Sequence, residues 1–129
     1  MWIQEFDPAQ RTVWIEVQLW GPSANRWYSF VLDTGSPVTV VDSDVADELG
    51  YSAMMGKGIH RFWSVGGPQY GYVLEMQQIE MLGAILRPCE VICQQLPRAL
   101  GVDGLIGVDL LVGRRILLDF AVGRIEVHG

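Results

Sequence analysis

The segment "SFVLDTGSPVTVVDSDVADELG" covers Ser29 to Gly50 and places an acidic residue at the end of an apolar run. Asp33 follows the residues Phe-Val-Leu directly, and Thr34 and Gly35 come next. Desolvation penalises a charged carboxylate in such surroundings, so a half-buried acid usually has a partner that stabilises it. The segment therefore raises the question of which group partners Asp33.

A strand pattern precedes this acid. Residues 12–20, "TVWIEVQLW", alternate apolar and polar side chains, with Val13, Ile15, Val17 and Leu19 on one face. A cluster of turn-forming residues follows, and "RWYSFVL" then reads as a second strand. The two strands predict a hairpin that ends at Asp33.

Short elements are predicted along the rest of the chain. Residues 43–50 have the pattern of a short helix that Gly50 ends. Residues 59–65 and 69–82 flank "GGP" and predict a long hairpin with a glycine tip. Further strands are predicted at residues 84–96, where Pro88 indicates an edge or a bulge, and at 105–107, 115–120 and 124–129, with a short helix at 108–113. The whole of residues 1–129 is expected to form one compact, mainly β domain.

The composition limits the possible partners. The net charge is −6, and Lys57 is the one lysine of the chain. This balance argues against a nucleic acid or an anionic membrane surface as partner. The sequence has neither a signal-peptide pattern after Met1 nor an apolar segment of membrane-spanning length, so no membrane association is expected.

The two cysteines, Cys89 and Cys93, are expected to be free thiols. On a strand they lie on one face about 13 Å apart, whereas a disulfide requires α-carbons within about 7 Å. Free thiols fit a reducing compartment, so a cytoplasmic location is expected. His60 and His128 have no neighbours at ligand spacing, and no metal site is predicted.

Two segments together resemble the retropepsin-like aspartic proteases. The first is "LDTGS", at the end of the predicted hairpin, and the second is "VDGLIGVDLL", Val102 to Leu111. The glycine-tipped hairpin "WSVGGPQYGY" stands where the family has its flap, and "LLDF" and "RIEV" close the chain. The resemblance implies an all-β acid-protease fold, a closed β-barrel with a flap hairpin and one or two short helices.

The same resemblance implies an aspartic endopeptidase that needs no metal or other cofactor. Such enzymes hold two carboxylates that share a proton and activate a water. This chain has one Asp-Thr-Gly triplet, because Asp103 and Asp109 lack the hydroxyl residue between acid and glycine. The partner of Asp33 is therefore expected to be Asp33 of a second copy, in a C2 homodimer that acts on a peptide or protein substrate.

The resemblance also assigns roles to individual residues. The catalytic residues are Asp33, Thr34, whose hydroxyl would bond the other subunit's backbone, and Gly35, which would let a substrate backbone come close. The expected substrate-binding residues are Ser36, bonded to an outer carboxylate oxygen, Leu105, and the flap tip of Val65, Gly66 and Gly67. Of Leu105 and Ile106, one lines the pocket and one packs in the core, and the alternation does not say which.

The chain also departs from the viral members of this family. Those commonly pair an acid after the triplet with a basic residue after the "IIG"-like segment, and Pro37 and Val108 stand at these places. Proline has no N–H to offer a substrate, so viral substrate preferences do not carry over. Asp109 is expected to cap the short helix after "LIG". The terminal strands are candidates for a dimer sheet, as in the viral enzymes.

Two alternatives belong to other functional classes. The first is a catalytically weak or inactive module that keeps the fold and binds a peptide in the flap groove. The size of the protein in solution separates it from the enzyme, since a strict monomer cannot form the pair of acids. The second is a small-ligand β-barrel in which the triplet is only a turn, and the fluorescence of the tryptophans with apolar ligands would reveal it.

Overall fold

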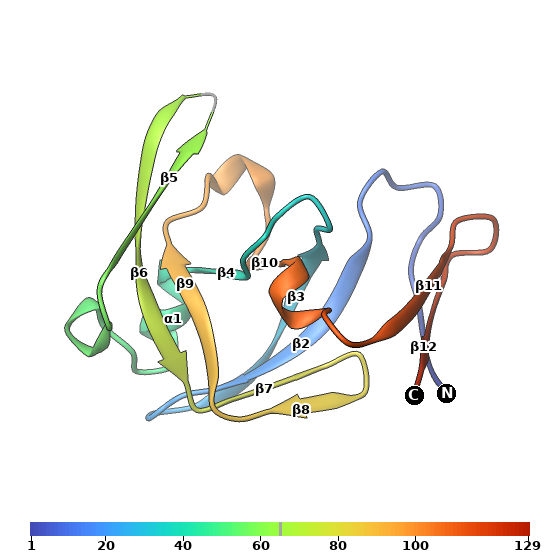
Figure 1. Cartoon of the computed structure of the whole chain (residues 1–129), viewed down its shortest axis with the longest axis horizontal. Helices are drawn as coiled ribbons and strands as arrows, with labels where there is room; N and C mark the ends of the chain where they lie inside the picture. Colours follow the sequence, from blue (N-terminus) through green and yellow to red (C-terminus); the bar gives the residue numbers. More distant parts are fainter. Residues whose placement is uncertain (65) are drawn as a thin grey trace.

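The computed structural model of the chain describes residues 1–64 and 66–129, and most of its regular structure is β (Figure 1). The strands are β1 (Trp2–Glu5), β2 (Trp14–Trp20), β3 (Asn25–Leu32), β4 (Val40–Asp42), β5 (Ile59–Ser64), β6 (Gly67–Met76), β7 (Gln78–Met81), β8 (Ala84–Leu86), β9 (Cys89–Gln94), β10 (Gly104–Ile106), β11 (Arg115–Asp119) and β12 (Arg124–His128). The helical elements are α1 (Ser43–Glu48) and the 3-10 turns η1 (Ala53–Met55), η2 (Arg98–Leu100) and η3 (Val108–Leu110).

The strands form two sheets. The larger has the order β5-β6-β9-β4-β10-β3-β2-β7-β8, and the smaller has the order β1-β12-β11. In the described part of the chain no strand pairing joins β5 to β8, so the expected closed barrel is not confirmed. The β5–β6 hairpin rises at one end of the molecule, and the small sheet lies at the other end with both termini (Figure 1).

The predicted hairpin before Asp33 is confirmed. Strands β2 and β3 pair in antiparallel fashion from Trp20 opposite Asn25 to Trp14 opposite Val31. The alternating apolar side chains of β2 are buried, because successive residues of a strand point to opposite faces and one face covers the core. The predicted helix is also present as α1, and Gly50 follows it with a φ of +95° that glycine tolerates.

Two predicted strands are each divided in the structure. Residues 69–82 form β6 and β7, because the Gln77 backbone N–H donates to the Tyr51 hydroxyl (2.9 Å) between them. Strand β6 then pairs with β5 and β9, and β7 with β2 and β8. Residues 84–96 divide into β8 and β9 at Pro88, which lacks the N–H that a ladder requires.

The two cysteines lie on β9, and both are buried and free, as the sequence predicted. None of the helices in the described part of the chain is long and apolar enough to cross a membrane.

A short central strand brings the two sequence motifs together. Strand β10 lies between β3, to which it is parallel, and β4, to which it is antiparallel. A β-carbon at Gly104 would stand 2.3 Å from the Phe30 ring and 2.5 Å from the Val40 carbonyl oxygen. Glycine at this position therefore allows the close packing that sets Leu105 opposite Val31 and Ile106 opposite Leu32.

A buried threonine ties the loop after β3 to the segment after β10. Thr39 is fully buried; its hydroxyl donates to Asp109 Oδ1 (2.8 Å), and its backbone N–H donates to Asp109 Oδ2 (3.0 Å). The same hydroxyl accepts the Gly107 N–H (3.0 Å). The prediction that Asp109 caps the short helix is wrong: Gly107 occupies the cap position, and the Asp109 carboxylate binds Thr39.

Replacing Thr39 with valine tests this link. Thr39→Val keeps the side-chain shape but leaves the Gly107 N–H without its acceptor and removes a donor from the Asp109 carboxylate. We expect the free energy of unfolding to fall by about 2 kcal/mol. Urea denaturation at a fixed protein concentration measures the change.

The matched control is Thr12→Val, because Thr12 is exposed. Its free energy of unfolding is expected to change by less than about 0.5 kcal/mol. Equal losses in the two variants would contradict the role given to Thr39.

Candidate active site

Asp33 stands directly after β3, where backbone contacts fix its position. Its N–H donates to the Ile106 carbonyl oxygen at the end of β10 (2.9 Å). Its carboxylate Oδ1 accepts the Gly35 N–H (3.0 Å), and the residue is half-buried. The acid is therefore oriented by its own loop and by the neighbouring strand, and part of it remains open to solvent.

The loop after Asp33 is held by further backbone bonds. The Ser36 N–H donates to the Asp33 carbonyl oxygen (3.1 Å), and the Ser36 carbonyl accepts the Val108 N–H (2.8 Å). The Ser36 hydroxyl donates to the Val38 carbonyl oxygen (2.7 Å). The expectation that this hydroxyl bonds the Asp33 carboxylate is wrong, because its one hydrogen is directed at Val38.

The next two residues of the triplet, Thr34 and Gly35, are exposed. Their position leaves the Thr34 hydroxyl accessible to a second chain and the Gly35 α-carbon accessible to a ligand backbone. Both fit the roles that the resemblance implies, and these roles stay predictions.

The two other acids close to the motifs are engaged elsewhere. The Asp103 carboxylate accepts the Ser29 N–H (3.0 Å), and the Asp109 carboxylate is bound to Thr39. Each thus stabilises the packing of β10 and its flanking turns. Neither is positioned by these bonds as a second catalytic acid for Asp33 of the same chain.

The cysteines do not offer an alternative nucleophile. Burial is the main cause that raises the pKa of the Cys89 thiol to about 11, with the charges of Asp109 and Glu90 adding to it. Burial likewise raises the pKa of the Cys93 thiol to about 11. Both groups are neutral thiols at pH 7, and the thiolate is the reactive form. Among the described residues, no group of three or more His, Cys, Asp or Glu side chains is arranged to hold a metal ion.

An apolar cavity begins beside the Asp33 loop. Its volume is about 390 Å³, and the described residues that line it are Ser36, Pro37, Val38, Val40, His60, Gln94, Leu96 and Leu105. Leu105 is half-buried and faces this cavity, whereas Ile106 is fully buried in the core. The structure thus resolves the alternative that the sequence left open between these two residues.

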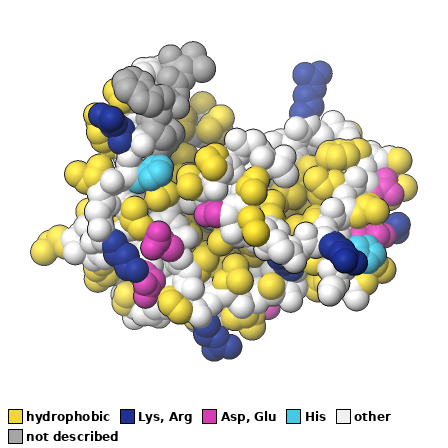
Figure 2. Space-filling model, in the orientation of Figure 1, with side chains coloured by type: hydrophobic (Ala, Val, Ile, Leu, Met, Phe, Trp, Pro, Cys, Tyr) yellow, Lys and Arg dark blue, Asp and Glu magenta, His cyan; other side chains and the backbone are white. Residues whose placement is uncertain are grey.

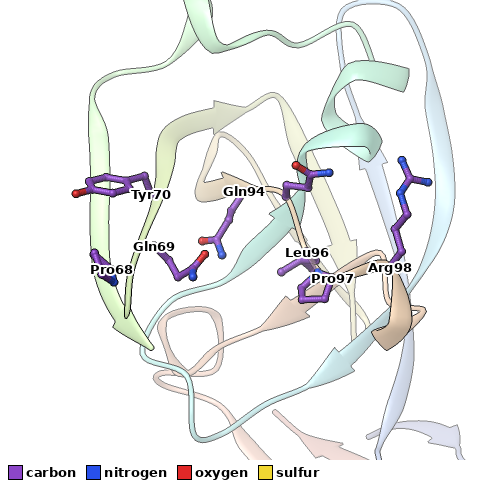
Figure 3. A pocket seen from close by; sticks show the side chains of 8 residues that line it. Pro68, Gln69, Tyr70, Gln94, Leu96, Pro97 and Arg98 are labelled. Carbon is purple, nitrogen blue, oxygen red and sulfur yellow. The ribbon is translucent and has the colours of Figure 1, made fainter. Parts of the chain in front are cut away.

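A second, more open groove lies beside the β5–β6 hairpin (Figure 3). Its volume is about 670 Å³, and it separates residues 68–70 of β6 from residues 94–98. It shares Gln94 and Leu96 with the apolar cavity, so the two are neighbouring parts of one depression. Hydrophobic side chains cluster over the middle of this face of the molecule (Figure 2).

The hairpin over this depression has the glycine tip that the sequence predicted. Strands β5 and β6 pair from Ile59 opposite Tyr72 to Ser64 opposite Gly67. Gly66 is exposed, and Gly67 has a φ of +108°, a backbone conformation that glycine readily adopts. Val65, the third residue of the expected flap tip, lies outside the described residues. His60, near the base of β5, lines the apolar cavity.

The terminal strands pair within one chain. Strand β1 is antiparallel to β12 from Trp2 opposite Val127 to Glu5 opposite Arg124. A dimer sheet in which the termini of two chains alternate would have to break these bonds. The strands remain candidates for contact through their exposed face, on which Ile3 and Leu117 are 47% and 46% exposed.

Sequence reasoning missed two polar residues that the structure brings to the site. Thr39 links the two motif segments, and Gln94 lines both parts of the depression. A signal for Thr39 was present, because it is a hydroxyl residue inside the β-branched run "VTVV". Gln94 gave no such signal, since its position depends on where β9 ends.

Comparisons with known proteins agree with this arrangement. A family model described as "Aspartyl protease" matches residues 17–110, which include Asp33 and Leu105 and make up well over half of the chain. No curated protein matches the chain. A solved structure, a retropepsin-like aspartic protease from Rickettsia conorii, is similar over 95% of this chain and 94% of that chain, with a TM-score of 0.71 and 15% identity. The chain belongs to the aspartyl protease family, and its fold is retropepsin-like.

Proposed function

We propose that the chain is an aspartic endopeptidase that acts as a C2 homodimer, with Asp33 of each subunit forming the catalytic pair. The observation that carries this proposal is the placement of Asp33, a half-buried carboxylate whose following loop, Ser36 to Val38, lines an apolar cavity. Membership of the aspartyl protease family supports peptide hydrolysis as the kind of reaction. No metal or other cofactor takes part in the proposed mechanism.

The chemistry follows from two carboxylates held close together. Ionising both carboxylates is unfavourable because their negative charges repel each other, so the two groups share one proton and titrate as a coupled pair. The ionised Asp33 removes a proton from a water as the water attacks the peptide carbonyl, and the protonated Asp33 polarises that carbonyl. The proton then passes to the leaving nitrogen. The bond from the Gly35 N–H to Oδ1 fixes the orientation of each carboxylate.

The need for a second chain is supported by the surroundings of Asp33. The second motif segment contains two acids, Asp103 and Asp109. Their carboxylates accept hydrogen bonds from the backbone N–H groups of Ser29 and Thr39. Val108 and Val112, in the segment after β10, are 39% and 74% exposed, and the Val108 N–H bonds the loop that carries the catalytic triplet. These exposed apolar side chains are a candidate contact surface for a second copy. Thr34 is exposed close by and is proposed to bond the partner's backbone.

The substrate is proposed to bind as an extended peptide between the hairpin and the floor of the depression. Leu105 and Ser36 belong to the floor, and Gly35 lets the peptide backbone approach the acids. Gly66 and Gly67 belong to the proposed flap tip, which covers the peptide and excludes water. Extended peptides suit such a groove, because their backbone groups are free to bond both walls.

Removing the carboxylate charge at Asp33 tests the mechanism. Asp33→Asn cannot activate the water, and we expect kcat to fall by at least about 100-fold between about pH 4 and about pH 7. A mixed peptide library with mass-spectrometric detection measures the loss. The control is Asp47→Asn, an exposed helix residue, and its activity should remain close to that of the parent. Equal cleavage by the parent and Asp33→Asn would exclude Asp33 as the catalyst.

Mixing subunits tests whether the site needs two chains. When the parent protein is equilibrated with an equal amount of Asp33→Asn, random pairing leaves one parental dimer in four, so activity per parental chain falls to about half. Without mixing, activity per chain should rise with protein concentration until dimers are complete. Unchanged activity after mixing would show that one chain carries the whole site.

A binding module without hydrolysis is the second candidate function. The groove beside the hairpin is the observation that favours it, since it would hold a peptide whether or not two acids meet. Binding of library peptides by a monomer, with no cleavage by any variant, would favour this candidate over the enzyme.

A further inference from the structure

Gln94, the last residue of β9, carries a buried polar atom without a partner. Its side-chain oxygen Oε1 is shielded from solvent and accepts no hydrogen bond in the described structure. Buried polar atoms are normally paired, because an amide oxygen that loses water without gaining a donor destabilises the protein. An orphaned amide oxygen next to a cavity is therefore a candidate acceptor for a donor that a ligand brings.

The cavity beside this amide is otherwise apolar. Its walls are formed by Val38, Val40, Leu96 and Leu105, and none of the described residues that line it is Asp, Glu, Lys or Arg. The Ser36 hydroxyl at its edge already donates to the Val38 carbonyl oxygen. Among the polar side chains that line this cavity, Gln94 is therefore the one whose oxygen is given no donor by the described structure.

Several contacts hold Gln94 in this place. It is opposite Asp42 at the end of the β4–β9 ladder, and the Asp42 carboxylate accepts the Leu96 N–H (2.8 Å), which turns the chain into the cavity wall. A β-carbon at Gly71 would stand 3.3 Å from Gln94 Cβ and 2.7 Å from the Cys93 carbonyl oxygen. Glycine at position 71 thus lets β6 lie close to Gln94. The Gln94 side chain is directed toward Gln69 across the groove (Figure 3).

We propose that Gln94 determines the specificity of the protease by selecting a substrate side chain that ends in a carboxamide, Asn or Gln, for the cavity beside Asp33; this rests on the proposed function. The apolar walls bind the aliphatic stem of such a side chain. Oε1 is shielded from solvent in the ligand-free chain, so the Gln94 side chain must turn toward the cavity for the substrate amide to donate to Oε1 and to accept from the Gln94 amide nitrogen. A site built around a hydrogen bond discriminates strongly against analogues that cannot form it.

Charged side chains do not suit this cavity. A carboxylate or an ammonium group would be desolvated there without an oppositely charged partner among the described lining residues. Aliphatic side chains would fill the walls but leave Oε1 unpaired. The cavity therefore favours an uncharged, hydrogen-bonding end over both classes.

The experiment compares matched peptides in the dimeric protein. A cleaved peptide from the library is resynthesised with Gln, Met, Glu or Lys at each position near the scissile bond. We expect kcat/KM for Gln to exceed that for Met by at least about tenfold at one position. Gln94→Leu should abolish this preference, and Gln94→Glu should shift it toward Lys at the same position, because a carboxylate then faces the cavity.

The control is Gln77→Leu, whose side chain is exposed and lines neither the apolar cavity nor the groove, and this variant should keep the parental preference. A parental preference for Met, or a Gln preference that survives in both Gln94 variants, would overturn the proposal. Thermal melting shows whether each variant is folded. Because two different substitutions are made at Gln94, one of them still tests the proposal if the other fails to fold.

The role of Gln94 can be tested even if the proposed protease activity is not found. If no peptide is cleaved, the binding of fluorescent Gln and Met peptides from the library is measured with the parent and with Gln94→Leu. Tighter binding of the Gln peptide that Gln94→Leu abolishes would support the role of Gln94 even though the protease proposal had failed. Equal binding of the two peptides, or none, would overturn it.

Discussion

The parallel pairing of β3 with β10 is the constraint on which the candidate site depends. Three residue pairs join these strands, and Gly104 makes them possible because a larger residue would collide with Phe30. The pairing brings together two segments that are some seventy residues apart and gives the Asp33 N–H its acceptor on Ile106. The Thr39–Asp109 bonds then fasten the loops on either side. The position of the acid is therefore set by backbone contacts from two distant parts of the chain.

The site combines an apolar cleft with a small number of polar groups, and each has a separable role. Asp33 supplies the proposed chemistry, and the proposed second acid comes from another copy of the chain, so we expect catalysis to depend on association. Gln94 is placed by the end of β9 and by Gly71, away from the acid, and would act on the choice of substrate. In the proposed mechanism, reaction and selection thus depend on different strands of the same sheet. We expect a change at Gln94 to alter which peptide is cut without changing how it is cut.

Local patterns predicted the strands that have simple, nearby partners. The alternation from Val13 to Leu19 fixed which face of β2 is buried, and the turn formers after it predicted the hairpin to β3. Alternation and turn-forming residues did not predict where the longer predicted strands are divided. At Gln77 the ladder is interrupted by the hydroxyl of Tyr51, twenty-six residues away in the sequence. Hydrogen-bond partners of this kind are determined by the packing of distant segments, and the periodicity of a sequence carries no information about that packing.

The sequence by itself determined the family and the candidate acid, because the triplet at Asp33 and the "LIG" segment are local patterns with family-specific spacing. It also indicated, through its single triplet, that a second chain is needed, which remains a proposal. Only the tertiary structure decided that Leu105 faces the cavity and that Asp109 binds Thr39 instead of capping a helix. It alone placed Gln94 beside the cavity. The physical reason is that side-chain partners and burial depend on long-range strand packing, whereas motif and alternation depend on neighbours in the chain.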